Sequence, residues 1–330
     1  MTATRPRPTD EELDAIAEGL APFNRRLILT GAGFTRPWGG YLTTDIWSLI
    51  ISDPAVYSCR ALNERLHVDF NFESVLADIE GELAGGFSDA DRNVMRGAVS
   101  RAFQIQQNRI HAKGPGAGEV VRHIIEALHD RHNKVSTCVF TLNQDLLFES
   151  FLLRYPNLLG PPGVESAMSR TTATVAPFEP KRFKSIKART SYIKLHGSMN
   201  WRDLGGQVIV LGGAKEAAIR RFDILRMNSA IFRRALMQPD GRLLVIGYGF
   251  GDEHINRIIA DAVGQGLKLW IADPRDPSSI RATMCEQKGK TSWGGIWKSV
   301  VGHSTGSEEL FGEDNDGIEF ELLRERFWNT

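Results

Sequence analysis

The chain has 330 residues with 42% hydrophobic side chains, enough to bury a core without disulfides or metals, and its 40 basic residues balance its 40 acidic ones. This zero net charge gives no indication of direct nucleic-acid binding, although it leaves a local basic patch open. The three cysteines, Cys59, Cys138 and Cys285, form no CxxC pair, which argues against disulfides and against a cysteine-rich zinc site. Because no apolar run approaches roughly 20 residues and the polar N-terminal segment lacks a signal-peptide core, we expect a soluble, cytoplasmic protein without membrane contact.

The apolar spacing predicts alternating strands and helices. A helix at about Asp10–Gly19 comes first, and a strand at Leu27–Thr30 then leads into a glycine turn. From about 45 to 132 the spacing is helical, with no convincing strand, which predicts an inserted helical layer. Further strands are predicted at Thr137–Leu142, Tyr192–Leu195, Val208–Leu211, Leu243–Ile246 and Leu267–Ile271. Helices are predicted between several of them, at Asp145–Leu153, Glu216–Met237 and Asp252–Val263.

This alternation predicts an α/β fold with a mostly parallel sheet covered by helices on both faces. We expect one domain over residues 1–330, with the helical insertion at about 45–132. The segment Pro161–Arg189, rich in proline, threonine and basic residues, is interpreted as a long loop.

The first strand is followed by Gly31, Ala32 and Gly33, a pattern that lets the backbone approach a dinucleotide pyrophosphate. The usual fingerprint has a third glycine three residues later, where this chain has Arg36. The spacing therefore differs from that of common NAD dehydrogenases, and a tight turn without ligand is an equal alternative. Arg36 would either pair with a phosphate or only solvate the loop.

A second motif, Thr-Leu-Asn-Gln-Asp, follows the next strand and contains Asn143 and Asp145. At the carboxyl end of a parallel strand, an amide can orient a water molecule or bind a carboxamide. Either residue could instead cap the following helix, which is the commoner role for these residue types.

A third motif, Leu-His-Gly-Ser-Met-Asn-Trp, places His196 at another strand end. A histidine there could relay a proton or bind ribose hydroxyls, although a purely structural role is more common. His254, in the run Asp252-Glu253-His254, suggests a metal, but no matching ligands are near in sequence, so this run is interpreted as a helix N-terminus. We expect no metal.

Two later strand ends complete the candidate site. Gly247 and Tyr248 begin a run of alternating glycines, which would permit close ligand approach or form only a flexible turn. Asp273 precedes a proline after the last predicted strand, where it could hold an adenosine ribose or merely form a turn.

The order of four motifs resembles the sirtuin (silent information regulator) superfamily. These motifs are Gly-Ala-Gly-Phe-Thr at 31–35, Thr-Leu-Asn-Gln-Asp at 141–145, Leu-His-Gly-Ser at 195–198 and the late glycine-bearing strand end. Leu-His-Gly-Ser-Met-Asn-Trp and Gly-Tyr-Gly-Phe-Gly-Asp-Glu-His-Ile-Asn look more closely like the sirtuin-like NAD hydrolases of bacterial antiphage defence. The paired CxxC motifs of deacetylating sirtuins are absent, as is the phenylalanine-arginine pair after the first glycines, where this chain has Trp38-Gly39-Gly40-Tyr41.

The resemblance implies a Rossmann-like fold without a zinc module and NAD⁺ as a substrate. It implies that Asn143 positions water or the ribose, that Asp145 helps bind the nicotinamide amide, and that His196 accepts a proton. The remaining NAD-binding candidates are Gly31, Ala32, Gly33, Phe34, Thr35, Arg36, Gly247, Tyr248 and Asp273. The expected reaction is hydrolysis of NAD⁺ to nicotinamide and ADP-ribose.

Protein deacylation, ADP-ribosyl transfer and non-catalytic sensing of NAD or ADP-ribose are the alternatives. The resemblance implies a role as an antiphage effector. Because uncontrolled loss of NAD would harm a cell, we expect its activity to be controlled by assembly or by another protein. The resemblance implies a homo-oligomer and a separately encoded activator, such as a hexameric DNA-translocating ATPase or a short argonaute. The inserted helices and residues Gly312–Thr330 are the predicted contact surfaces.

Overall fold

A computed structural model describes residues 7–80, 86–128, 136–155, 158–187, 190–212, 215–285, 291–311 and 318–328. Its centre is a seven-stranded sheet in the order β11-β10-β9-β1-β2-β6-β3, and all neighbouring strands are parallel. The strands are β1 (Arg26–Thr30), β2 (Thr137–Thr141), β3 (Leu158–Leu159), β6 (Thr190–Lys194), β9 (Arg242–Ile246), β10 (Lys268–Ala272) and β11 (Val300–Ser304). The predicted parallel α/β fold is confirmed, and it is Rossmann-like.

Side chains of successive strand residues point to opposite faces of the sheet, so each buried strand supplies two cores. In β1, Leu27 and Leu29 belong to one core, whereas Ile28 belongs to the other. The same alternation occurs in β9, where Leu243 and Val245 face the first core and Leu244 the second. Continuous apolar strands are therefore explained by helices on both faces.

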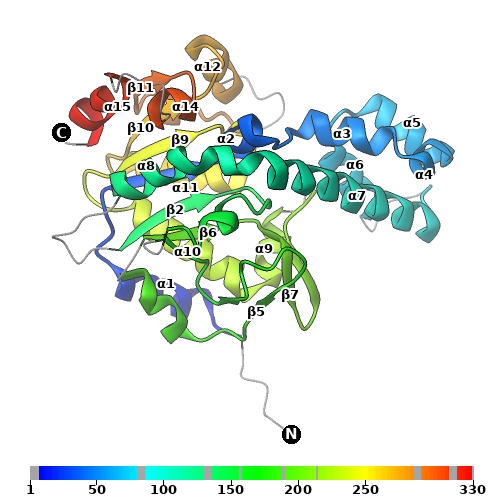
Figure 1. The fold of residues 1–330 in the computed structure, drawn as a ribbon, viewed down its shortest axis with the longest axis horizontal. Helices are drawn as coiled ribbons and strands as arrows, with labels where there is room; N and C mark the ends of the chain where they lie inside the picture. The colour runs from blue at the N-terminus through cyan, green and yellow to red at the C-terminus, as the bar shows by residue number, and fades with distance from the viewer. Residues whose placement is uncertain are drawn as a thin grey trace, which may run out of the picture.

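Different helices cover the two faces (Figure 1). The first face packs against α1 (Asp10–Leu20), η4 (Pro180–Lys187), α10 (Asp223–Leu236), α11 (Glu253–Gly264), α12 (Pro277–Cys285) and α13 (Gly294–Trp297). The second packs against η2 (Gly114–Ala117), α8 (Gly118–Leu128), η3 (Phe148–Phe151), α14 (Ser307–Phe311), α15 (Ile318–Leu323) and the π-helical turn η5 (Arg324–Trp328). None of the helices in these ranges is both long and apolar enough to cross a bilayer.

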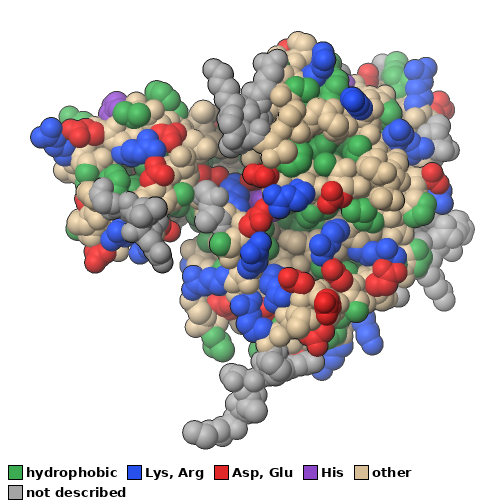
Figure 2. Space-filling view, turned by 180° about the vertical axis from the view of Figure 1, so that it is seen from behind, with side chains coloured by type: hydrophobic (Ala, Val, Ile, Leu, Met, Phe, Trp, Pro, Cys, Tyr) green, Lys and Arg blue, Asp and Glu red, His purple; other side chains and the backbone are tan. Residues whose placement is uncertain are grey.

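Between β1 and β2 the chain forms a helical projection, residues 43–113, which we call the arm. The chain enters it through the short turns α2 (Ala32–Thr35) and η1 (Arg36–Trp38). The arm contains α3 (Thr43–Ile51), α4 (Pro54–Tyr57), α5 (Arg60–Val68), α6 (Phe72–Glu80) and α7 (Asp89–Lys113). It has its own apolar core, which includes Ile50, Leu66 and Val75. Figure 1 shows the arm extending from one side of the sheet, and Figure 2 shows a lobe that projects from the rest of the surface.

The predicted helical character of residues 45–132 agrees with the arm, although residues 81–85 and 129–132 lie outside the described part of the chain. The last helix of that stretch, α8, packs against the central sheet through Val120, Ile124 and Leu128 rather than joining the arm.

The predicted strand Val208–Leu211 forms part of a second sheet, not of the central one. This four-stranded sheet has the order β4-β5-β7-β8, with β4 (Val164–Glu165), β5 (Ala173–Val175), β7 (Gly197–Asp203) and β8 (Gly206–Ile209). The predicted loop Pro161–Arg189 is therefore partly ordered as β4, β5 and η4; its residues 188–189 are outside the described chain. Trp201, fully buried, anchors β7 in a small apolar cluster.

Two predicted helices differ from the structure. The segment Asp145–Leu153 forms only the single 3-10 turn η3. The segment Glu216–Met237 is two helices, α9 (Lys215–Arg221) and α10, because Phe222 between them adopts an extended conformation with φ −116° and ψ 119°. Residue patterns also missed β11, whose Val-Val-Gly-His-Ser sequence is only partly apolar.

Candidate functional site

The candidate site lies where the order of the sheet reverses. From β1 the chain continues through β2 and β6 on one side, whereas β9 and β10 lie on the other side of β1. In open α/β sheets, such a switch point leaves a crevice at the carboxyl ends of the strands, where ligands bind. The loops that follow β1 and β9 meet there.

Glycines allow these two loops to touch. The Gly33 N–H donates to the carbonyl of Gly247 at 2.9 Å. Gly247 has φ +60°, and a Cβ atom there would lie 2.3 Å from the Phe34 nitrogen. A Cβ on Gly31 would lie 2.7 Å from the Gly247 oxygen. The glycines are therefore required for backbone packing between loops, in addition to any role toward a ligand.

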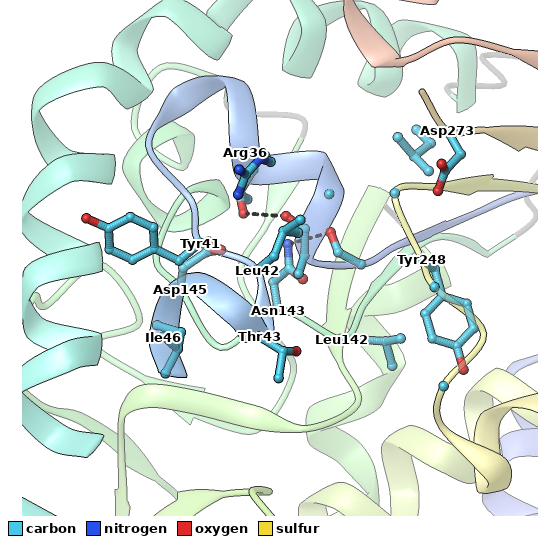
Figure 3. Close-up of a pocket in the computed structure, with 18 of the residues that line it drawn as sticks. Arg36, Tyr41, Leu42, Thr43, Ile46, Leu142, Asn143, Asp145, Tyr248 and Asp273 are labelled. Atoms are coloured by element: carbon cyan, nitrogen blue, oxygen red, sulfur yellow. Dashed lines mark hydrogen bonds between the residues drawn. The ribbon is translucent and has the colours of Figure 1, made fainter. Parts of the chain in front are cut away.

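A cavity of about 1110 Å³ opens over these loops and extends to the arm. Small-molecule sites typically occupy about 300–1,000 Å³, so the space is sufficient for a dinucleotide. Predicted residues that line it are Gly31, Ala32, Gly33, Thr35, Arg36, Asn143, Asp145, His196, Gly247, Tyr248 and Asp273. The arm contributes Thr43, Ile46, Phe72, Glu73, Phe103 and Gln106. Figure 3 shows Tyr41 and Ile46 toward one side of this cavity and Asp273 and Tyr248 toward the other, with Arg36 and Asn143 between them.

The loop after β2 holds Asn143 by hydrogen bonds. Its side-chain Nδ2 donates to the Gly31 carbonyl at 3.0 Å, and its backbone N–H donates to Thr141 Oγ1 at 3.1 Å. The Asn143 side chain therefore joins the β1 and β2 loops and does not cap a helix. Asp145 does make a cap-like contact, because its Oδ1 accepts from the Leu147 N–H at 3.0 Å. Burial raises the pKa of the Asp145 carboxyl, against the opposing effect of Lys194.

Beneath this loop, Lys194 forms a buried cluster of polar contacts. Its Nζ lies 2.9 Å from Glu149 Oε1 and donates to Ser198 Oγ at 2.9 Å and to the Asp145 carbonyl. Only 1% of the Lys194 side chain and 3% of the Glu149 side chain are exposed, so neither charge is well solvated. The ammonium group thus fixes the carbonyl of Asp145, which is two residues after Asn143 and ends the same motif.

His196 is 2% exposed at the end of β6. Its Nε2 lies 2.9 Å from Nε2 of His254, the second residue of α11. Burial lowers the pKa of His196 to about 3; Asp252 opposes this shift, whereas Lys215 and His254 add to it. His196 is therefore a neutral imidazole at pH 7.

Three ionic side chains adjoin this histidine pair. Lys215 Nζ lies 2.7 Å from Asp252 Oδ1 and 2.7 Å from Glu73 Oε2 of the arm. Burial opposes ionisation of Asp252, but His196 and Lys215 lower the pKa of its carboxyl to about 2. Asp252 is the N-cap residue of α11, so the predicted helix start is confirmed. Its side chain makes no capping hydrogen bond, and its carboxylate pairs with Lys215 instead.

His196, Asp252 and His254 also have the composition of a metal site, since one ligand atom from each lies within 4.8 Å of the others. Two histidines and one carboxylate are a common ligand set for transition metals. Lys215, however, already occupies one Asp252 oxygen with a positive charge.

The other predicted residues have varied surroundings. Arg36 forms an ion pair with Asp45 of α3, and half of its side chain is exposed. The Tyr248 hydroxyl donates to Asn256 Oδ1 at 2.9 Å and anchors the β9–α11 loop. Phe34 is the one predicted cofactor contact whose side chain lies elsewhere: it is fully buried in the core, with its ring stacked on Phe148.

Asp273 at the end of β10 is 5% exposed, and both of its oxygens accept hydrogen bonds from the Arg275 guanidinium, at 2.8 and 2.9 Å. Its Oδ1 also accepts from the Arg275 backbone N–H at 2.9 Å, which is the turn geometry expected before a proline. Asp273 thus forms a turn and also lines the cavity, so its position agrees with both interpretations, a turn residue and a residue that holds the adenosine ribose.

Residues 137–291 match the family model of the SIR2-like domain. This protein carries a SIR2-like domain. The match begins at β2 and includes Asn143, His196, Gly247 and Asp273, and this family of enzymes uses NAD. A search of curated proteins found no match to the chain.

The SIR2-like match does not include β1, the Gly31–Gly33 turn or the arm. The structure nevertheless brings these segments to the same cavity as the matched residues. Sequence reasoning missed Glu73, Gln106, Lys215 and Arg275 as cavity residues, because all four stand within ordinary helical or turn patterns. It also missed the contact of His254 with His196, which are 58 residues apart.

Proposed function

We propose that this SIR2-like protein hydrolyses NAD⁺ to nicotinamide and ADP-ribose. The observation that carries the proposal is that Asn143 and His196, from the ends of adjacent strands β2 and β6, line one cavity with the glycine loops of β1 and β9. A site that only bound NAD would have no chemical need for a buried neutral histidine and a fixed amide in the same cavity.

The reaction breaks the bond between the nicotinamide nitrogen and C1′ of the ribose. Nicotinamide leaves as a neutral pyridine with the bonding electrons, and positive charge develops on the ribose. A water molecule attacks C1′ and loses one proton, so each turnover gives nicotinamide, ADP-ribose and a proton. Asn143 would orient this water or the ribose, and the neutral His196 would accept the proton.

The arm supports hydrolysis over deacylation. Thr43, Ile46, Phe72 and Phe103 of the arm line one side of the cavity. Water is small enough to reach C1′ there without a peptide channel.

The direct test is to incubate purified protein with NAD⁺ and to follow nicotinamide and ADP-ribose by chromatography. Asn143→Ala and His196→Ala are expected to lower turnover by about a hundredfold or more. Asn63→Ala and His67→Ala, both on α5 of the arm, are matched controls that should keep the parent rate. If both cavity variants fold and retain parent turnover, the assignment of the site is wrong; acyl-ADP-ribose or labelled protein as the product would instead indicate deacylation or ADP-ribosyl transfer.

We further propose that the activity serves antiphage defence and depletes NAD on activation. Because free turnover would be toxic, we expect control by a homo-oligomer and by a separately encoded activator, such as a hexameric DNA-translocating ATPase or a short argonaute. The arm offers exposed apolar side chains for such contacts, with Tyr57 77%, Val68 78% and Phe70 61% exposed. Of the other predicted surface, Gly312–Thr330, residues 312–317 and 329–330 lie outside the described chain.

Light scattering at several protein concentrations, combined with the nicotinamide assay, tests this control. Activity that rises with the oligomeric fraction would support it, and full activity of a monomer at all concentrations would contradict it.

A further inference from the structure

His196 and His254 form a histidine pair through their Nε2 atoms, and such a pair can pass a proton from one ring to the other. The two Nε2 atoms are 2.9 Å apart and the ring centroids 5.1 Å apart. In this hydrogen bond, one imidazole must donate an N–H and the other must accept with a lone pair. His196 lines the cavity, whereas His254 is not among the described residues that line it and is partly exposed on α11.

We propose that His254 relays the proton that His196 accepts from the attacking water, and so returns His196 to its neutral form. This inference rests on the proposed hydrolysis. His254 does not touch the substrate in this scheme; it is a positioning and relay residue that acts through His196.

The scheme assigns a tautomer to each ring. His196 carries its proton on Nε2 and donates it to His254, which leaves Nδ1 of His196 as the acceptor. When Nδ1 takes the proton of the attacking water, the Nε2 proton passes to His254 Nε2. His254 then releases the proton on its own Nδ1 to solvent, which leaves both tautomers reversed. They are restored before the next turnover when solvent returns a proton to His254 Nδ1, the Nε2 proton passes back to His196, and the His196 Nδ1 proton leaves to water in the emptied cavity, so each turnover releases one net proton.

The surroundings explain why His196 needs such a relay. Burial disfavours a charged His196, so an imidazolium there would be costly. Burial also lowers the pKa of His254, which is less deeply enclosed. The charged groups that face the pair are Asp252 and Glu216, which favour the protonated form of His254, and Lys215 and Arg257, which disfavour it. Asp252 thus faces both rings as the nearest counter-charge.

A bound metal is the competing explanation for these three side chains. The Lys215 ammonium, 2.7 Å from Asp252 Oδ1, opposes a second cation at this carboxylate. Cobalt(II) provides the probe, because its visible absorption reports histidine ligation. We expect that titration with cobalt(II) gives no absorption band of histidine-ligated cobalt and that EDTA does not change turnover. A stoichiometric cobalt band that is lost in His254→Ala would overturn the relay.

The kinetic test compares His254→Ala with His254→Gln. Glutamine can keep a hydrogen bond to His196 but cannot take up and release a proton. We expect both variants to lose about a hundredfold in kcat, with KM for NAD⁺ within about twofold of the parent. Imidazole in the buffer is expected to restore part of the His254→Ala rate, with rescue that depends on the pKa of the imidazole used. His67→Ala is the control for the added buffer.

Parent-like kcat in His254→Gln would show that a hydrogen bond is sufficient and would overturn the relay. The ¹⁵N chemical shifts of the two imidazoles give a readout that does not require turnover. The relay requires a protonated Nε2 on His196 and an unprotonated Nε2 on His254, and the reverse assignment would refute it. If the parent protein releases no nicotinamide under any condition, the hydrolase proposal fails, while the shifts still decide the tautomers.

Discussion

The two walls of the cavity are built differently. The sheet wall, made by the loops after β1, β2, β6 and β9, is held by buried contacts such as those of Asn143 with Gly31 and of Lys194 with Glu149. The arm wall is held by more exposed contacts, such as Arg36 with Asp45, whose side chains are 50% and 31% exposed. The groups proposed to react, Asn143 and His196, thus belong to the wall with the more deeply buried contacts, and the arm lines the other side of the cavity.

The walls are joined by Lys215, which bonds Glu73 of the arm and Asp252 of the sheet wall. Burial raises the pKa of Glu73, and Lys215 counters this shift. A conformational change in the arm can therefore alter the ion pair between Lys215 and Asp252, next to the histidine pair. This contact offers a physical route by which a partner bound to the arm would influence the site.

The largest expected effect tests the rigidity of the sheet wall. Lys194→Met would leave Glu149 and the Asp145 loop buried without their cation, so the free energy of unfolding should fall by about 3–5 kcal/mol. Urea denaturation measures it, and Lys298→Met, at an exposed position, should change stability by less than about 0.5 kcal/mol. Adding Glu149→Gln should recover part of the loss. A loss under about 1 kcal/mol in Lys194→Met would show that the ion pair does not stabilise this wall.

A second, smaller effect concerns pH. His196 has a folded pKa of about 3, below its unfolded value of about 6.5, so the unfolded chain binds more protons in this interval. Stability should therefore fall as pH decreases through this window, by up to about 1.4 kcal/mol per pH unit for each such histidine. Unfolding measured between pH 7 and 4.5 should show a shallower slope in His196→Gln than in the parent. His67→Gln, at an exposed position of the arm, should keep the parent slope; equal slopes in all three proteins would contradict a buried neutral His196.

The smallest expected effect on stability tests the arm wall. Arg36→Ala removes a half-exposed ion pair, so the free energy of unfolding should change by less than about 1 kcal/mol. If Arg36 contacts a phosphate of NAD⁺, KM should rise by about tenfold while kcat stays near the parent value. Asp45→Asn breaks the same pair without removing the guanidinium and should leave KM nearly unchanged. Equal KM values in all three proteins would leave Arg36 as a solvating residue only.

Local patterns predicted much of the central sheet because its strands are short, apolar runs between helices. The segments Leu27–Thr30, Thr137–Leu142 and Leu243–Ile246 closely match β1, β2 and β9. Val208–Leu211 has the same apolar character but pairs with β7, since pairing partners are set by the path of the chain and not by composition. The Asp145–Leu153 pattern likewise failed as a long helix, because Asp145 and Glu149 face the buried Lys194 cluster.

By itself the sequence determined the strand ends that carry Asn143, His196, Gly247 and Asp273, because glycines and polar residues after apolar runs mark the carboxyl edge of a parallel sheet. Only the tertiary structure decided what stands beside them. His254 at the start of α11 meets His196 in the segment between β6 and β7, Lys215 links the arm to Asp252, and Phe34 enters the core. Such contacts join residues tens of positions apart, and local spacing carries no information about them.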